Sequence, residues 1–352
     1  MINLSSVWIV VLNWNGLVDT FVCLASLRRL RYPAARVVVV DNGSSDGSAA
    51  AIRRDPANGG VEIIEAKRNL GYAGGNNLGI RHALDHGADF ILVLNNDTKV
   101  DPMLLDELLA AAERQPGAGC FGPWIYYMHD PERLWFTRSD WSREKSAFTA
   151  PWKGRLASEL PNETMSTDYV CGAALFFRAE VARQIGLLDE RFFLVYEDSD
   201  WCLRARRAGF ACASIPSARV WHKVGTSFGS ESSPLRTYFS SRNRLLWAEK
   251  NLSRREWWGI VRAAVRRICP GFAIDEDASV PRYKALLWAN KGFMRECARK
   301  VRDPQEAAHR RGVLDYVFRR FGDCPPRIRA LARAWASARE EAAQASGVGH
   351  RG

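Results

Sequence analysis

Short apolar strands alternate with helical segments through the first part of this chain, and this alternation limits the folds that the chain can adopt. Apolar runs rich in β-branched residues predict buried strands, and apolar residues three or four positions apart predict the helices between them. The predicted strands are 7–12, 37–40, 61–65 and 90–94, and the predicted helices are 19–30, 48–54, 76–86 and 102–114. This order favours an α/β fold with a doubly wound, Rossmann-like, mainly parallel sheet flanked by helices.

The pattern changes after the alternating region. Residues 121–168 are rich in Trp, Pro, Ser and charged side chains without a clear period, so we expect irregular loops there. Regular elements then return as a strand at 169–178, helices at 179–185 and 197–209, and a largely helical segment from residue 235, which we expect to fray after about residue 336. We therefore place one domain at residues 1–247 and a mainly helical C-terminal region at 248–352.

The net charge of +11 is concentrated near the C-terminus. Residues 1–250 contain 29 Lys and Arg against 28 Asp and Glu, whereas residues 251–352 contain 21 against 11. A basic region of this kind favours contact with the phosphates of lipid headgroups or of nucleic acid, and a solvated helical surface is the alternative.

Neither a membrane span nor a secretory signal is predicted. No run of about eighteen apolar residues occurs, and Met1–Leu12 lacks a basic segment and a small-residue cleavage site. The eight cysteines are scattered without a CxxC pair, which favours reduced, mostly buried thiols over a disulfide framework or a zinc site. We therefore expect a cytoplasmic protein.

Hydrogen-bonding side chains follow the carboxyl ends of the four predicted strands. They are Asn13, Trp14 and Asn15 after the first strand, Asp41 and Asn42 after the second, Arg68 and Asn69 after the third, and Asn95, Asn96 and Asp97 after the fourth. Each group alone is explained equally well by turn chemistry. Because ligands of open parallel sheets bind beyond the carboxyl ends of the strands, the four groups together favour a ligand site at this edge.

Asp97 is the best candidate for a metal ligand. Mg²⁺ and Mn²⁺ are commonly held by one or two carboxylates together with the phosphates of a substrate. The alternative role, capping the helix near Pro102, suits Asp101 better. The glycine-rich stretch 71–77 opens a helix whose amides could receive phosphate, although it is neither a dinucleotide motif after the first strand nor a P-loop.

Glu197, Asp198 and Asp200 form an acidic cluster at the start of a predicted helix. Capping and the helix dipole are one explanation, but a helix needs a single cap, and a carboxylate beside a hydroxyl group is what general-base catalysis requires. Asp198 and Trp201 share one helical face, so a base and an aromatic platform for a sugar ring would face the same cleft. His222 lies before a small-residue loop and is a candidate contact to a metal or a pyrophosphate, with a structural role as the alternative.

In this order, these motifs resemble the family 2 glycosyltransferases of the GT-A fold, in particular the rhamnosyltransferase-like enzymes that build bacterial lipopolysaccharide and other surface glycans. The likeness is carried by residues 10–16, 40–47, 69–77 and 94–97, then by Gly172 to Ala174, Glu197, Asp198 and Asp200, Trp221 and His222, and residues 238–244. Each motif is modest alone, but the ordered set over residues 7–247 is specific.

The resemblance implies an inverting, metal-dependent transferase that moves rhamnose or a similar sugar from a dTDP-, UDP- or GDP-linked donor. The acceptor would be a saccharide or a lipid-linked saccharide in cell-surface polysaccharide synthesis. A nucleotide-sugar half would cover residues 1–120, and an acceptor half would cover 121–247. By position, the nucleotide-sugar contacts would be Asn13, Trp14, Asp41, Arg68, Gly75, Asn95 and Asn96, and the acceptor contacts would be Gly172 and Trp201.

The resemblance also implies the reacting groups. Asp97 and His222 would hold Mn²⁺ or Mg²⁺, and Asp198 would be the catalytic base, with Glu197 as the second choice. Asn95 stands where the family has the first acid of its Asp-x-Asp motif, so Asp97 would be the chief ligand. The implied reaction is a single displacement in which the metal stabilises the departing diphosphate.

Two other functions would require features of their own. A sugar nucleotidyltransferase would need a basic glycine-rich loop after the first strand, and a nucleic-acid-binding protein would need a recognisable motif. The sequence contains neither, so we expect no nucleic-acid partner.

Residues 255–268 predict an amphipathic helix. Its apolar face carries Trp257, Val261, Ala264, Val265 and Ile268, its opposite face carries Arg255, Arg262 and Arg266, and Trp258 lies at the boundary. Such a helix can lie on an anionic membrane surface, here the inner face of the plasma membrane, and packing on the catalytic domain is the alternative.

Overall fold

The computed structural model describes residues 4–224, 233–268 and 303–345. The chain divides into two compact units, residues 1–224 and residues 225–352, and each is considered by itself. The domain boundary predicted at residue 247 lies within helix α7 (Pro234–Asn251) and stays a prediction.

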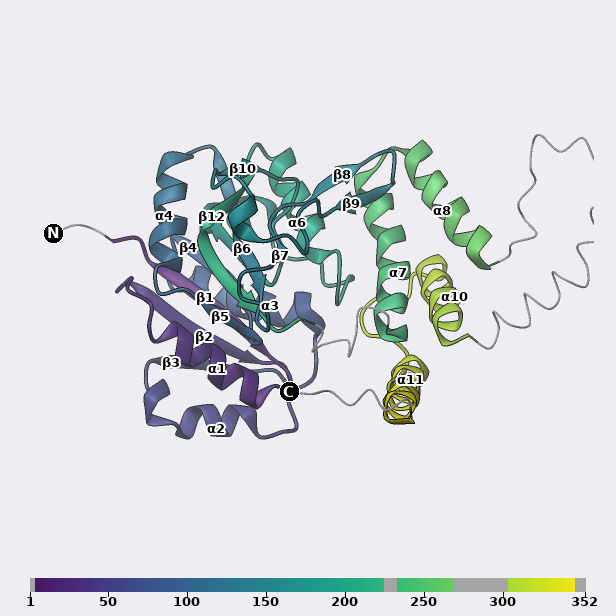
Figure 1. The fold of residues 1–352 in the computed structure, drawn as a ribbon, viewed down its shortest axis with the longest axis horizontal. Coiled ribbons are helices and arrows are strands. Elements are labelled where there is room, and N and C mark those ends of the chain that lie inside the picture. The colour runs from purple at the N-terminus through teal and green to yellow at the C-terminus, as the bar shows by residue number, and fades with distance from the viewer. Residues whose placement is uncertain (1–3, 225–232, 269–302, 346–352) are drawn as a thin grey trace, which may run out of the picture. The chain divides into compact units, whose positions relative to one another are not determined.

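A ten-stranded sheet forms the centre of the first unit (Figure 1). Its order is β10-β12-β6-β11-β4-β1-β2-β3, with β5 beside β12 and β7 beside β6. The strands are β1 (Val7–Asn13), β2 (Ala35–Asp41), β3 (Val61–Glu65), β4 (Phe90–Asn95), β5 (Thr98–Val100), β6 (Ala118–Tyr127), β7 (Leu134–Phe136), β10 (Met165–Ser166), β11 (Ala174–Arg178) and β12 (Ala211–His222). A separate hairpin joins β8 (Asp140–Ser142) to β9 (Ala147–Thr149).

The sheet is mainly parallel, as the sequence predicted. Strands β3, β2, β1 and β4 run parallel to one another, and β6 and β12 form a second parallel pair. Strand β11 lies between these two groups and is antiparallel to both of its neighbours. The α/β fold class is therefore confirmed.

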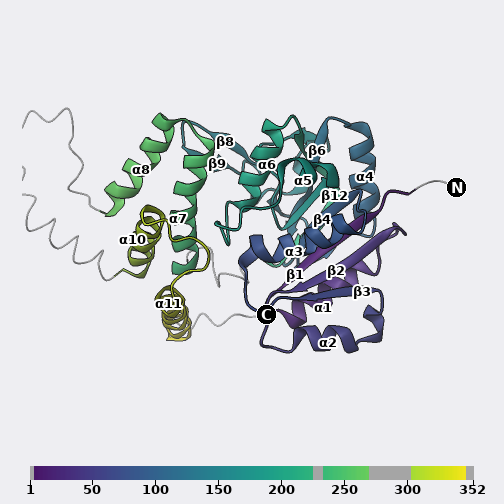
Figure 2. The same cartoon turned by 180° about the vertical axis from the view of Figure 1, so that it is seen from behind.

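Helices cover both faces of this sheet (Figure 2). They are α1 (Leu17–Leu27), α2 (Ser48–Arg54), α3 (Gly71–Asp85), α4 (Leu104–Arg114), α5 (Ala179–Ile185) and α6 (Glu197–Arg207), with short 3-10 turns at Pro56–Asn58 and Ala157–Glu159. One apolar core lies between the sheet and α1, α2 and α4, and the other lies under α3, α5 and α6. Alternate residues of β1 enter the two cores, which explains why this strand is apolar throughout.

Strand register brings together the polar residues predicted at the carboxyl ends of the strands. We call this edge of the sheet the rim. Asn13 pairs with Asp41 across β1 and β2, and Leu12 pairs with Asn95 across β1 and β4. At the end of β12, His222 pairs with Thr98, the residue after Asp97. The rim therefore forms at the predicted edge, and β12 adds His222 to it.

Helix α3 starts earlier than predicted. We expected it to begin at residue 76, after a glycine-rich loop, but the helix begins at Gly71 and contains these glycines. A Cβ atom at Gly75 would overlap Leu12, and one at Gly79 would overlap Val10. The glycines therefore let the helix lie directly on β1.

The prediction of irregular loops at 121–168 is wrong for its first part. Strand β6 continues to Tyr127 in the centre of the sheet, and most of its residues are buried. Pro123 hid this strand from sequence reasoning, because proline cannot donate to a ladder. Here Pro123 pairs with Ile215 at a register shift in β12, where the ladder is already interrupted.

The second unit is helical, as predicted for the C-terminal region. Its described helices are α7, α8 (Arg254–Ile268), α10 (Pro304–Val317) and α11 (Pro326–Ala345). The continuous helix α11 contradicts the predicted fraying after residue 336. The sequence Cys-Pro-Gly at 269–271 also predicts a break in this helical region, and it lies outside the described residues. Among the described residues, no helix combines the length and the hydropathy that a membrane crossing needs.

Helix α8 packs against α7 and α10 within this unit. Ile260 is buried, and Nε1 of Trp257 donates a hydrogen bond to the hydroxyl of Tyr316 at 3.0 Å. Trp257, on the predicted apolar face, therefore contacts a neighbouring helix of its own unit. Trp258, in contrast, is 52% exposed and Val265 is also exposed.

Candidate active site

Asn13 is fully buried and ties the rim together. Its Oδ1 accepts hydrogen bonds from the Gly16 amide at 3.2 Å, from Oγ1 of Thr20 at 2.9 Å and from Nδ2 of Asn96 at 3.3 Å. Its Nδ2 donates to Oγ of Ser44 at 3.3 Å. Asn13 and Asn96 therefore hold the loops after β1, β2 and β4 in place, and direct contact of either side chain with a nucleotide stays a prediction.

Asp41 and Asn42 fix the loop after β2. Oδ1 of Asp41 accepts a hydrogen bond from the Ser44 amide at 2.8 Å, and Asn42 bonds the backbone of Leu70 and Gly71 at 2.9 and 3.0 Å. The φ angle of Gly43 is +74°, and a Cβ atom there would lie 2.7 Å from the backbone of Arg68. Only glycine therefore fits this turn.

The other predicted nucleotide-sugar residues differ in exposure. The side chains of Trp14 and Arg68 are exposed near the same strand ends, so both can reach a ligand there. Gly75 is buried, and a Cβ atom would lie 3.0 Å from Nδ2 of Asn42. Gly75 therefore permits close packing beneath the rim.

Asp97 and His222 meet at the end of β4. Nε2 of His222 lies 3.0 Å from Oδ1 of Asp97 and 3.4 Å from Nδ2 of Asn95. His222 is 6% exposed and Asp97 is 7% exposed. Nδ1 of His222 is buried without a hydrogen-bond partner. Without a metal, the imidazole proton is therefore expected on Nε2, where it can be donated to Asp97.

These two side chains fit a divalent cation. Adjacent ligands of an octahedral ion with bonds of about 2.1 Å lie about 3.0 Å apart, which is the observed separation of Oδ1 and Nε2. The amide of Asn96 points away toward Thr20, at 2.9 Å. Asp97 and His222 are therefore the candidate protein ligands, and a bound diphosphate and water would supply the rest.

Asp198 lies at the start of α6 with both carboxylate oxygens held by the backbone. Oδ2 accepts a hydrogen bond from the Gly172 amide at 2.9 Å, and Oδ1 accepts one from the Ser199 amide at 2.7 Å. Desolvation outweighs these bonds and raises the pKa of Asp198 to about 6. This carboxylate is thus oriented, half-buried and ionised at neutral pH, as a general base must be.

Glu197 is in a different state. It is 5% exposed, and its Oε2 is buried without a hydrogen-bond partner. Burial, followed by the negative charge of Asp198, raises the pKa of Glu197 well above its ordinary value. Asp200 is fully buried and pairs with Arg204 at 3.1 Å. Of the three acids, Asp198 is therefore the best candidate base.

Tyr72 in α3 makes a hydrogen bond to the segment that holds Asp198 of α6. Sequence reasoning missed this residue. Its hydroxyl donates to the carbonyl oxygen of Gly172, whose amide holds Asp198, and its own amide donates to Phe193 at 2.6 Å. A Cβ atom at Gly172 would lie 2.7 Å from the Tyr72 hydroxyl. Gly172 is thus placed to position Asp198, and its predicted acceptor contact is not tested by this geometry. No sequence pattern identified Tyr72, because its partners lie about 100 residues away.

Trp201 does not lie where the sequence placed it. It is only 2% exposed, its ring packs 4.7 Å from that of Phe177, and its Nε1 donates to the Gly186 carbonyl at 2.9 Å. Helical spacing put it on the face of Asp198, but the wide indole turns into the core under α6. Trp201 is therefore a core residue here and offers no ring face to a sugar.

Comparison with known proteins gives this site its context. The sequence model of glycosyl transferase family 2 matches residues 8–186, which include the ends of β1 to β4, Asp97 and Gly172 but end before Asp198 and His222. The chain belongs to this family. It is therefore a glycosyltransferase, and the resemblance inferred from the motifs is confirmed.

Several relatives of known activity are similar to this family 2 chain. The N-acetylglucosaminyl-diphospho-decaprenol L-rhamnosyltransferase of Mycobacterium tuberculosis is 32% identical over 229 residues, which cover 59% of this chain and 73% of that protein. The dTDP-rhamnosyl transferase RfbF of Shigella flexneri is 26% identical over 263 residues, which cover 70% and 81%.

A solved structure supports the fold. The mannosyltransferase PcManGT from Pyrobaculum calidifontis, determined in complex with GDP-Man and Mn²⁺, matches with a TM-score of 0.53. The match covers 90% of this chain and 89% of that chain, at 14% sequence identity. At this identity the likeness concerns the fold alone, and it confirms the predicted GT-A architecture.

Proposed function

We propose that this family 2 enzyme moves rhamnose or a similar hexose from a nucleoside-diphosphate donor to a saccharide or lipid-linked saccharide acceptor, with inversion. The observation that carries the proposal is a metal-type pair, Asp97 and His222, near an oriented carboxylate, Asp198. The Gly172 amide holds Asp198, and the next residue, Ala173, accepts a hydrogen bond from the Asn95 amide at 3.0 Å. The rhamnosyltransferase relatives support the sugar class. The nucleotide would lie along the strand ends near Asp41, Arg68 and Trp14.

A divalent ion, Mn²⁺ or Mg²⁺, would be held by Asp97 and His222. When bound, such an ion neutralises the negative charge that develops on the departing diphosphate. The protein then needs no acid to protonate the leaving group.

Asp198 would remove the proton of the acceptor hydroxyl. Its two oxygens each accept one backbone hydrogen bond, and each keeps a further lone pair for the acceptor. The hydroxyl oxygen would attack the anomeric carbon from the face opposite the diphosphate, which inverts that carbon. Tyr72 and Gly172 would hold the base in line.

Trp135 is the aromatic side chain that we propose for sugar contact in place of Trp201. Its ring packs edge-on against His222, with centroids 4.6 Å apart, and it is half-buried. Tyr169 lies further along the same group of aromatic rings, through Phe136. Trp135→Ala is expected to raise KM for a sugar substrate about tenfold or more, whereas an unchanged KM would remove Trp135 from the site.

We further propose that the enzyme works in the cytoplasm on the inner face of the plasma membrane. Helix α8 exposes Trp258 and Val265 beside the exposed side chains of Arg255, Arg262 and Arg266. A basic helix with an exposed indole suits an anionic lipid surface. This face replaces the one centred on Trp257, which is occupied by packing.

The proposal is tested by incubating the purified chain with dTDP-, UDP- and GDP-linked sugars and measuring the nucleoside diphosphate released. Release should require Mn²⁺ or Mg²⁺ and should be fastest with one donor, expected to be dTDP-rhamnose. The matched test variant is Asp97→Asn, which keeps the size of the side chain and removes its charge. Equal release with and without metal would contradict the metal assignment.

A further inference from the structure

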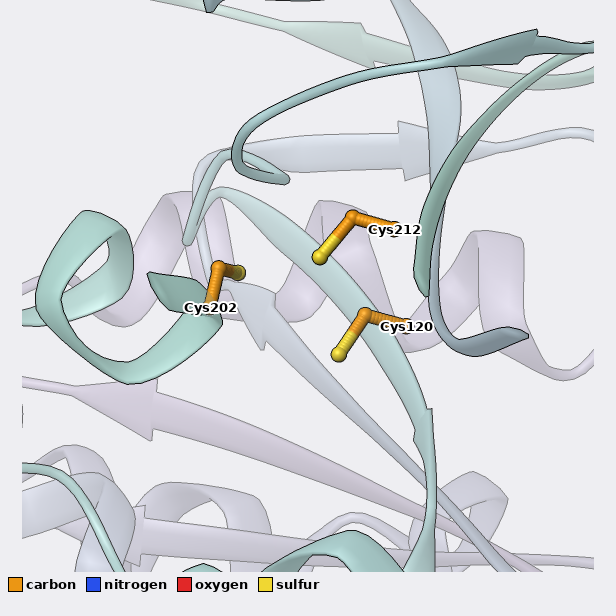
Figure 3. A group of neighbouring side chains, drawn as sticks. All are labelled: Cys120, Cys202 and Cys212. Carbon is orange, nitrogen blue, oxygen red and sulfur yellow. The ribbon is translucent and has the colours of Figure 1, made fainter. Parts of the chain in front are cut away.

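Three cysteines far apart in the sequence meet in the core of the first unit. Cys120 on β6 and Cys212 on β12 are paired neighbours on parallel strands, and Cys202 faces them from α6. Their sulfur atoms lie within 4.8 Å of one another and point toward a common centre (Figure 3). Among the described residues, this is the only group of three or more metal-type side chains that lie this close.

All three thiols are shielded from solvent, with exposures of 0–1%. Buried cysteines often act as small apolar side chains, and the sequence predicted no more than this. Packing alone, however, does not require three sulfur atoms from three elements to converge. The 82 and 10 residues that separate Cys120, Cys202 and Cys212 hid this group, because metal-site patterns rely on short spacings.

We propose that Cys120, Cys202 and Cys212 form a binding site for one soft monovalent metal ion of the Cu(I) class. Sulfur ligands select soft ions, and Cu(I) is among them. Three sulfur atoms around one ion, with bonds of about 2.3 Å as for zinc thiolates, lie about 4.0 Å apart. This separation is inside the observed limit of 4.8 Å.

Charge favours a monovalent ion over Zn²⁺. A single monovalent ion needs only one thiolate beside two neutral thiols to balance its charge. Binding forms bonds from the metal to the three sulfur atoms, and one thiol proton is lost to solvent, with no change in oxidation state. The product is neutral, as an apolar core requires.

Zn²⁺ fits this group less well. A structural zinc ion takes four ligands, and the described residues supply three metal-type side chains in this group. With three thiolates it would also leave a net negative charge in the core. An apparent affinity for Zn²⁺ above that for Cu(I) would therefore overturn the assignment.

The site lies behind the candidate base. Cys202 follows Asp198 by one helical turn, and its sulfur accepts a hydrogen bond from the Val170 amide at 3.4 Å. The segment after Val170 leads to Gly172, whose amide holds Asp198. Resting on the proposed function, we infer that a bound ion alters the position of Asp198 and lowers turnover.

The test is a competition titration of the reduced full chain with Cu(I) against the chromophoric chelator bicinchoninate, without oxygen. The variants are Cys212→Ala and Cys202→Ala, and Cys324→Ala is a matched control, because Cys324 is a buried free cysteine in the other unit. Wild type and Cys324→Ala should bind one more Cu(I) per chain than the two cluster variants. Equal stoichiometry in all four proteins would overturn the site.

Two further measurements keep the inference testable. If the cluster variants do not fold, X-ray absorption at the copper edge of the loaded wild type should show about three sulfur neighbours, and a nitrogen or oxygen shell would contradict the site. In an activity assay, Cu(I) should inhibit wild type and Cys324→Ala but spare Cys212→Ala. Equal inhibition of Cys212→Ala would contradict the link to Asp198 and leave the transferase assignment untouched.

Discussion

Replacing Asp198 by asparagine removes the proposed proton acceptor and keeps the size of the side chain. General-base contributions are about 10²- to 10⁴-fold, or about 3–5 kcal/mol of transition-state stabilisation. We expect turnover to fall by this factor while the affinity for the donor stays within about twofold, because the base contacts the acceptor. Single-turnover transfer and calorimetric donor binding measure the two quantities separately.

The pH profile makes this prediction sharper. Because burial raises the pKa of Asp198 to about 6, the ionised base is lost as the pH falls through 6. Its ionised fraction is about 97% at pH 7.5 and about 9% at pH 5, so wild-type kcat/KM should fall about tenfold between them. In Asp198→Asn this acidic limb should disappear.

The structure also sets the control for this variant. Both oxygens of Asp198 accept backbone hydrogen bonds, so the amide of asparagine must face one donor, which costs about 1–3 kcal/mol. The unfolding free energy must therefore be measured beside turnover. Asp130→Asn, at an exposed pair with Arg133, is a matched exchange that should change neither. Turnover of Asp198→Asn within tenfold of wild type would refute the assignment.

Three further predictions follow from the same geometry. Asp97→Ala should abolish the Mn²⁺-dependent part of donor binding in calorimetry with no change in fold, and donor binding that still responds to Mn²⁺ would exclude Asp97 as a ligand. Gly75→Ala should lower the unfolding free energy by about 1–3 kcal/mol, because the new Cβ overlaps Leu12, whereas Gly259→Ala in the open part of helix α8 should be neutral or stabilising. Binding to phosphatidylglycerol vesicles should weaken with salt and with Trp258→Ser plus Arg262→Glu, and binding that neither change weakens would contradict the membrane surface.

The sequence predicted the rim because its signals are local. Buried parallel strands are continuously apolar, and the residues just after them must lie at one edge of the sheet. The observed register of Asn13 with Asp41 and of Leu12 with Asn95 follows from that rule. Asp97 and Asp198 could be singled out for the same reason, since each lies at the end or start of a predicted element.

Side-chain direction and long-range pairing could not be predicted in this way. Helical spacing placed Trp201 beside Asp198, but the pocket under α6 takes the indole into the core. Strand β6 was missed because Pro123 is tolerated only through a bulge in a partner strand some 90 residues later. Tyr72 and the three-cysteine group depend on similar distant partners, which one sequence does not reveal.

The most direct test of the central claim is the anomeric configuration of the product. The purified chain, Mn²⁺, the preferred sugar nucleotide and a polyprenyl-diphosphate saccharide acceptor are incubated, and the new linkage is examined by NMR. The product is expected to be a glycoside whose anomeric configuration is opposite to that of the donor. Wild type and Asp130→Asn should form it at the same rate, and Asp198→Asn should form it at no more than about one-hundredth of that rate. A product that retains the donor configuration would contradict single displacement with Asp198 as the base.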